Sequence, residues 1–206
     1  DKLETSPATS QPSTTKPSPD SYPTILNVQV ALQQLKSSHT SPNQLALCLE
    51  NIGDWALSSD THRKETTAGG GVAAIVNAMK RYPQDSKVQH KGCWALMHVA
   101  VNDSNRVSIA SEGGIPAIVE AMCLHLQDTN VQQYGCCAFA YLADNSNNRV
   151  FIATTGGISL VLEAMRQHPQ DSKVQCQGCW ALARLAVNDH YRVSIATAGG
   201  ISAVIE

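Results

Sequence analysis

The chain has 206 residues, and 15 Lys and Arg stand against 17 Asp and Glu, so its formal net charge is −2. This length can bury a sizeable core in one domain or one extended array. The near-neutral charge offers no basic surface for nucleic acid, which we exclude as a partner. No apolar run approaches the roughly 20 residues of a membrane helix, so we expect no direct membrane insertion. The first residues lack the basic start and the apolar core of a signal peptide, so we expect none there.

Residues 1–23 form a Ser/Thr/Pro-rich segment without apolar periodicity. Such a segment cannot bury enough apolar surface to offset its chain entropy, so we expect it to be a disordered linker. Ser6-Pro7 and Ser18-Pro19 also fit proline-directed phosphorylation sites, but a solvated linker is the interpretation we favour.

The rest of the chain repeats itself every 43 residues. The letters GCWAL begin at Gly92 and Gly178, and GCCAF begins midway at Gly135. The same step links Arg63, Arg106, Arg149 and Arg192, the pairs Gly70-Gly71, Gly113-Gly114, Gly156-Gly157 and Gly199-Gly200, and Val88, Val131 and Val174. A period of about 40–47 residues belongs to helical solenoids of the armadillo and HEAT types.

Each unit predicts three helices. A short first helix follows a residue suited to an N-cap, namely Asp60, Asp103, Ser146 or Asp189. The Gly-Gly pair ends that helix, because glycine tolerates the left-handed conformation. The second helix reads IPAIVEAM from Ile115, and Pro116 is tolerated in its first turn.

The third helix is the longest of the unit. It begins after Asp85, Asp128 or Asp171 and carries apolar residues near i, i+3, i+4 and i+7. Asn102, Asn145 and Asn188 follow it, as expected of a residue that caps or turns the chain.

Three helices per unit, with GGIPAIV opening the second and GCWALxxLA in the third, resemble the armadillo repeat. The resemblance covers residues 24–206 and implies an all-α, right-handed α-solenoid. We expect full units at 60–102, 103–145 and 146–188. A partial unit at 24–59 lacks its first helix, and another at 189–206 breaks off inside its second. Val204 and Ile205 end on an uncapped apolar stripe, so we expect more repeats to follow.

The resemblance also implies where partners bind. In armadillo proteins of the importin-α type, third helices line a concave groove in which a Trp and an Asn four residues later grip an extended basic peptide. The Trp position here holds Asn51, Trp94, Cys137 and Trp180, and the Asn position holds Trp55, His98, Tyr141 and Arg184. No unit keeps the Trp/Asn pair, and Arg184 would repel a basic ligand, so recognition of nuclear-import signals is disfavoured.

A mixed aromatic and polar groove remains a candidate surface for a protein or extended peptide. The predicted groove residues are Trp55, Lys87, His90, Lys91, Trp94, His98, Asn130, Gln133, Tyr134, Tyr141, Lys173, Gln177, Trp180 and Arg184. The alternative is that Trp94 and Trp180 pack between neighbouring third helices, and both interpretations stay open because Trp often does both.

The seven cysteines predict reduced thiols. They are Cys48, Cys93, Cys123, Cys136, Cys137, Cys176 and Cys179. Their odd number and apolar helical settings are typical of an intracellular protein, so we expect the cytoplasm, with the nucleus as the alternative.

A zinc site built from Cys176-x-x-Cys179 and the equivalent His90-x-x-Cys93 is disfavoured. The two pairs are two repeats apart, roughly 16–20 Å for packed helices, whereas zinc needs ligands about 2 Å away. We therefore expect core packing and no metal or cofactor.

The arginine ladder, formed by Arg63, Arg106, Arg149 and Arg192, is expected to cap carbonyls or bridge neighbouring units.

The sequence shows no phosphate-binding loop, no nucleophile elbow and no distinctive carboxylate pair. It therefore favours a non-enzymatic scaffold or adaptor that binds partner segments along the third-helix groove. The alternatives are a regulatory array of a larger enzyme, such as a kinase or a GTPase-linked protein, and a nuclear transport receptor that recognises basic peptides.

Overall fold

The computed structural model describes residues 28–200, which form twelve helices and contain no strand. The helices are α1 (Val28–Lys36), α2 (Pro42–Ser58), α3 (Asp60–Ala68), α4 (Gly71–Arg81), α5 (Ser86–Val99), α6 (Asp103–Ser111), α7 (Gly114–Leu124), α8 (Thr129–Leu142), α9 (Ser146–Thr154), α10 (Gly157–Gln167), α11 (Ser172–Leu185) and α12 (Asp189–Thr197). The expectations for residues 1–23, Val204 and Ile205 lie outside the described residues.

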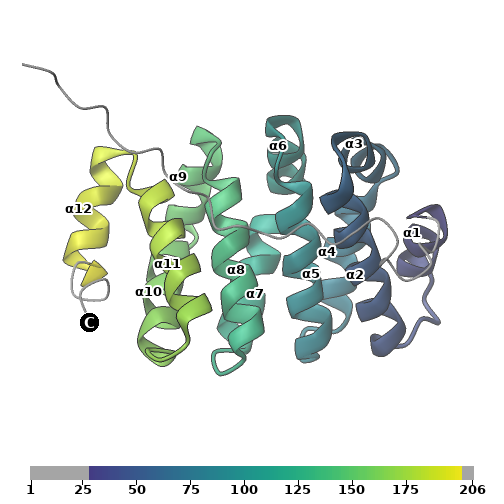
Figure 1. Cartoon of the computed structure of the whole chain (residues 1–206), viewed down its shortest axis with the longest axis horizontal. Helices are drawn as coiled ribbons and strands as arrows, with labels where there is room; N and C mark the ends of the chain where they lie inside the picture. The colour runs from purple at the N-terminus through teal and green to yellow at the C-terminus, as the bar shows by residue number, and fades with distance from the viewer. Residues whose placement is uncertain (1–27, 201–206) are drawn as a thin grey trace, which may run out of the picture.

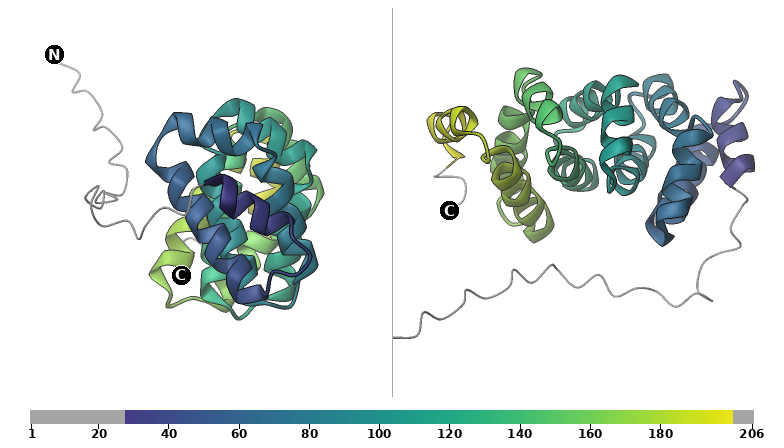
Figure 2. Two further views of the ribbon diagram at one scale, coloured as in Figure 1. Left: turned by 90° about the vertical axis from the view of Figure 1, so that its right-hand side faces the viewer. Right: turned by 90° about the horizontal axis from the view of Figure 1, so that it is seen from above.

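The helices form an elongated array (Figure 1). Third helices α2, α5, α8 and α11 pack against one another in sequence, and second helices α1, α4, α7 and α10 do the same. Figure 2 shows the short first helices along one edge of the array. One continuous apolar core runs from Val28 to Ile195, so each unit buries its apolar face against its neighbours. The all-α helical solenoid predicted from the period is confirmed.

Two glycines make the turn between first and second helices, each for a different reason. Gly113 has φ 85°, in the left-handed region that favours glycine. Gly114 follows it, and a Cβ there would lie 2.4 Å from Cγ2 of Ile109. The predicted Gly-Gly turn is therefore confirmed, and it needs both glycines.

The predicted starts of the third helices are confirmed, but the predicted N-caps of the first helices are one residue out. The Asp85 carboxylate accepts a hydrogen bond from the Val88 N–H at 3.1 Å, and Asp128 and Asp171 do the same in α8 and α11. The first helices instead have Ser59, Asn102 and Asn145 at the N-cap, and Asp60, Asp103 and Ser146 are already helical. Acidic residues in a first turn are favoured by the helix dipole without being caps.

The arginine ladder has the predicted structural role. Arg63, Arg106 and Arg149 donate to the carbonyls of Ala56, Val101 and Ala143 at the end of the preceding third helix. Arg106 also bridges to Asp144, which follows the third helix of the same unit, with nitrogen and oxygen 3.2 Å apart.

A glutamine ladder was not predicted. Gln89, Gln132 and Gln175 each donate to two carbonyls near the end of the second helix of their own unit. For Gln89 the acceptors are the carbonyls of Met79 and Tyr82, at 2.9 and 2.8 Å. These bonds join the second helix to the third, and so fix the direction in which the third helix leaves the turn.

Candidate protein-binding surface

All fourteen predicted groove residues lie on the third helices. Trp55 is on α2, and α5 carries Lys87, His90, Lys91, Trp94 and His98. Helix α8 carries Asn130, Gln133, Tyr134 and Tyr141, and α11 carries Lys173, Gln177, Trp180 and Arg184. We call these residues the third-helix surface. Because neighbouring third helices pack directly, side chains one repeat apart can meet.

Two aromatic pairs join neighbouring helices on this surface. The rings of Trp94 and Tyr134 meet edge to face, with centroids 5.2 Å apart and planes at 70°. The rings of Tyr141 and Trp180 do the same at 4.9 Å and 80°. All four rings are partly buried, so each pair leaves some aromatic area open to a partner.

Trp94 is also a packing residue. A Cβ on Gly53 would lie 2.4 Å from Cδ1 of the Trp94 indole, so the ring rests directly on the α2 backbone. The packing interpretation of Trp94 is therefore confirmed, and because the ring is only partly buried, the binding interpretation stays a prediction.

Two ion pairs neutralise cations of the surface. The Lys91 ammonium and the Glu50 carboxylate are 2.5 Å apart. The Arg184 guanidinium is 3.1 Å from the Asp144 carboxylate and lies over the Trp180 ring, 5.9 Å from its centroid. Arg184 is therefore held by an acid and an indole, and its charge is largely compensated.

Glu50 and Asp144 were missed by the sequence analysis. Neither carboxylate recurs at the 43-residue step: the positions aligned with Glu50 are Cys93, Cys136 and Cys179, and those aligned with Asp144 are Val101 and Val187. The only signal available was their place in the sequence, with Glu50 one residue before Asn51 at the Trp position and Asp144 three residues after Tyr141.

His98 is the predicted residue least able to touch a partner. It is only 8% exposed, and its ring meets the Trp94 ring edge to face at 4.1 Å. Burial, and to a lesser degree the charge of Arg63, lower the pKa of His98 to about 4. His98 is therefore neutral at pH 7, and its ring packs against the Trp94 ring.

Trp55 is covered in a different way. Its indole stacks on the His62 ring of α3, with centroids 3.7 Å apart and planes at 21°. The His62 ring is held in turn, since its Nδ1 is 2.6 Å from the Ser58 hydroxyl. Trp55 thus lies apart from the two aromatic pairs on α5, α8 and α11.

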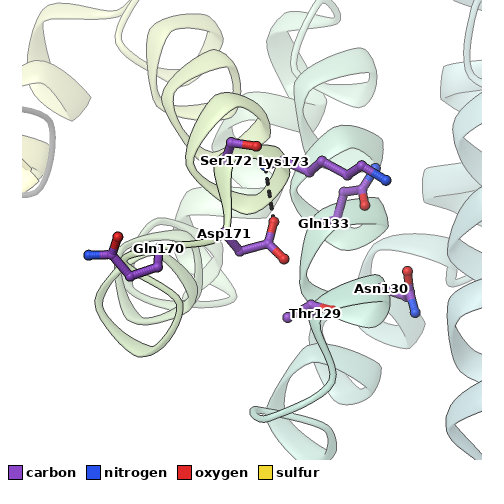
Figure 3. A pocket seen from close by; sticks show the side chains of 7 residues that line it. All are labelled: Thr129, Asn130, Gln133, Gln170, Asp171, Ser172 and Lys173. Atoms are coloured by element: carbon purple, nitrogen blue, oxygen red, sulfur yellow. Dashed lines mark hydrogen bonds between the residues drawn. The ribbon is translucent and has the colours of Figure 1, made fainter.

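A shallow polar cleft lies at the start of α8 and α11 (Figure 3). Its lining comprises Thr129, Asn130, Gln133, Gln170, Asp171, Ser172 and Lys173. Three of these belong to the predicted surface, so Asn130, Gln133 and Lys173 are brought together. Asp171 is already used as an N-cap, and its Oδ1 accepts from the Lys173 N–H at 3.0 Å.

The cysteines have the free thiols expected, with Cys48, Cys93, Cys136 and Cys137 buried. Burial raises the pKa of Cys93 to about 12, so this thiol stays protonated at neutral pH. Within residues 28–200, no three His, Cys, Asp or Glu side chains gather closely enough to hold a metal ion.

No single helix of the described part has the length and apolarity to cross a membrane. Helices α6 and α7 reach that length and apolarity only when they are taken together, and the chain bends by 70° between the two helices.

Comparisons with known proteins agree with this architecture. A family model described as LRRK2 ARM repeat matches residues 71–199. No curated protein matches the chain. An engineered protein of known structure is 23% identical with a TM-score of 0.77, and the match covers 86% of this chain and 71% of that one.

Two designed armadillo repeat proteins are also similar in structure. YIII(Dq)4CqI is 18% identical with a TM-score of 0.73, over 85% of this chain and 72% of that one. YIII(Dq.V1)4CPAF, solved in complex with the peptide (KR)4, is 19% identical with a TM-score of 0.70, over 86% and 72%. At these identities the likeness concerns the fold. The family model spans more than half of the sequence, and with the three-helix units and their 43-residue ladders it shows that the chain belongs to the armadillo repeat family.

Proposed function

We propose that this chain is a non-enzymatic interaction module that binds extended segments of partner proteins along the third-helix surface, as a scaffold or adaptor. One observation carries the proposal: the aromatic pairs Trp94–Tyr134 and Tyr141–Trp180 lie on one face. The third helices of three successive units, α5, α8 and α11, contribute them. Aromatic side chains are the residues that most often anchor protein interfaces.

The surface is preorganised for such binding. Trp180 is held between Tyr141 and Arg184, and Arg184 is fixed by Asp144. Side chains that are already fixed lose little rotamer entropy when a partner binds, which is a main cost of association. Exposed amides and hydroxyls around them, such as Asn130, can bond the backbone of an extended segment.

The designed relative in complex with (KR)4 supports extended-peptide binding as a use of this fold. For the present chain a basic peptide is the weaker candidate. The Trp position is Asn51 on α2 and Cys137 on α8, and the Asp144 carboxylate, which could attract a basic peptide, is already paired with Arg184.

A second candidate is that the array regulates a larger enzyme of which it is one part. The family model favours it to the extent that its description names the ARM repeat of one particular protein, LRRK2. The sequence on both sides of these residues tests it, because a kinase or GTPase domain would support the candidate and a chain of repeats alone would contradict it.

We also propose the cytoplasm, with the nucleus as the alternative, as the site of action. The support is the set of free thiols among the described residues, which suits a reducing compartment. Fractionation of cells that express the natural protein tests this.

The proposed function is tested by selecting peptides from a displayed random library with the whole chain as bait. Selected peptides are then titrated against Tyr134→Ala/Trp180→Ala. A matched control is Glu120→Ala/Leu124→Ala on α7, where both side chains are exposed. We expect at least tenfold weaker binding to the first variant and unchanged binding to the control. Equal binding to both variants would contradict the proposal, provided that circular dichroism shows both to be folded.

A further inference from the structure

We propose that the third-helix surface is occupied by the chain's own proline-rich segment, residues 6–23, which competes with partner segments for the aromatic pairs. The inference rests on the proposed function, since it names an occupant of the same surface. It is argued from the charge of the surface, the chemistry of its aromatic residues, and the composition and reach of the segment.

The surface does not select strongly for charge. Lys91 is paired with Glu50, and Arg184 with Asp144. The other charged side chains of the third helices there have both signs: Asp54, Lys87 and Lys173. A strongly basic or acidic segment would therefore gain little net Coulomb energy along α2, α5, α8 and α11. A segment of balanced charge suits this surface better.

The aromatic pairs offer what a proline-rich segment needs. Each pair places two rings nearly at right angles, at 70° for Trp94–Tyr134 and 80° for Tyr141–Trp180. Proline rings dock in grooves lined by aromatic rings. Within the described residues, the hydroxyls of Tyr134 and Tyr141 have no hydrogen-bond partner, although both rings make aromatic contacts. Both hydroxyls can therefore donate to a ligand.

Those hydroxyl donors match the backbone of polyproline II helix. In that conformation the carbonyls make no internal hydrogen bonds and face outward. A tyrosine hydroxyl beside a ring surface can therefore donate a hydrogen bond to such a carbonyl while the ring contacts a proline. The surface combines both features on α8, next to Trp94 and Trp180.

Residues 6–23 have the matching composition. They contain five prolines, at Pro7, Pro12, Pro17, Pro19 and Pro23. Their charged residues are Lys16 and Asp20, so the segment is neutral overall. A segment rich in proline loses less entropy when it becomes ordered than other extended segments do, because its backbone is already restricted.

The segment is also long enough. The chain between Pro7 and Val28 could reach about 65 Å at 3.1 Å per residue of polyproline II. The third helices from α2 to α11 span only about 30 Å at 8–10 Å per helix pair. The excess leaves enough chain to pass from α1, in the row of second helices, to the third-helix surface.

The test uses the whole chain and a fluorescein-labelled synthetic peptide of residues 6–23. The first variant replaces all five prolines of the segment by alanine. A matched control replaces Thr9, Ser10, Ser13, Thr14 and Thr15 by alanine and keeps the prolines. Fluorescence anisotropy measures peptide binding to each chain. We expect binding to the proline variant, at least tenfold weaker binding to the parent and the control, and loss of binding when Tyr134→Ala and Trp180→Ala are added to the proline variant.

Two results would overturn the inference. One is that the peptide fails to bind the proline variant. The other is that the peptide binds the parent and the proline variant equally, since the segment then does not occupy the surface. In either case, library-selected peptides that still lose binding through Tyr134→Ala/Trp180→Ala would leave the proposed function standing. If those peptides also bound Tyr134→Ala/Trp180→Ala as well as the parent chain, both proposals would be contradicted.

Discussion

Single residues of the third-helix surface serve the fold, and in the proposed function the same residues contact the partner. Trp94 rests on Gly53 with one edge and meets Tyr134 with its ring. Arg184, which by residue type would repel a basic ligand, is compensated by Asp144. The 43-residue register could identify Trp94 and Arg184 as surface positions. It could not identify Gly53 or Asp144, because their roles come from one particular neighbour and not from the repeat.

Gly53→Ala tests the packing of Trp94. Alanine is about 1 kcal/mol better than glycine inside a helix, but its Cβ would lie 2.4 Å from the indole, and such overpacking costs about 1–3 kcal/mol. We expect a lower free energy of unfolding in urea and a shifted tryptophan emission. An increase in stability would show that Trp94 does not rest on α2.

His98 should make stability depend on pH. Its pKa in the folded chain is about 4, below the ordinary 6.5, so protons bind the unfolded chain more readily. The stabilising contribution is present above pH 6.5 and is lost as pH falls toward 4, by about 2–3 kcal/mol at pH 4.5. Urea unfolding at pH 7 and 4.5 measures it. His98→Gln should flatten this pH dependence, and an unchanged slope in that variant would contradict the assignment.

At the scale of the helices, the sequence period was sufficient for most of the fold. The third helices begin after the predicted aspartates, and the left-handed glycines close the first helices. The first-helix caps were placed one residue late, because Ser or Asn followed by Asp or Ser gives two adjacent residues that both suit a helix start. The glutamine ladder repeats in the sequence, but its acceptors are backbone carbonyls, which no residue pattern marks.

Gln89→Leu tests that ladder. The substitution removes the donor to the Met79 and Tyr82 carbonyls at a position only 2% exposed. Leaving buried acceptors unsatisfied costs about 1–3 kcal/mol, so we expect a loss of that size in chemical unfolding. Gln84→Leu, an exposed glutamine in the same turn, is the control and should be near neutral. Equal effects of the two would argue against a specific role for Gln89.

Residues 28–200 form an array whose helices pack chiefly against those of the same or the adjoining unit, so binding positions form a line and not a pocket. The 43-residue ladders predicted both the armadillo family and the helical solenoid. The family model confirms the first, and the similar solved structure confirms the second. The third-helix surface as a binding site stays a prediction. Its ion pairs and aromatic pairs depend on side chains that differ from unit to unit, which is why the repeat pattern alone could not define its chemistry.

At this scale the (KR)4 peptide provides a sharp prediction. The designed armadillo protein was solved with it, whereas the present surface lacks the Trp/Asn pairs and has Asp144 already paired with Arg184. We expect no binding that Tyr134→Ala/Trp180→Ala abolishes, measured by calorimetry at low salt. Tight binding lost in that variant would instead support the nuclear transport alternative.

The most direct test of the central claim is a footprint of a library-selected peptide on the whole chain by hydrogen exchange. The account predicts slower exchange on α5, α8 and α11, around Trp94, Tyr134 and Trp180, with little change on α4, α7 and α10. Protection confined to the second helices, with the third helices unchanged, would contradict it.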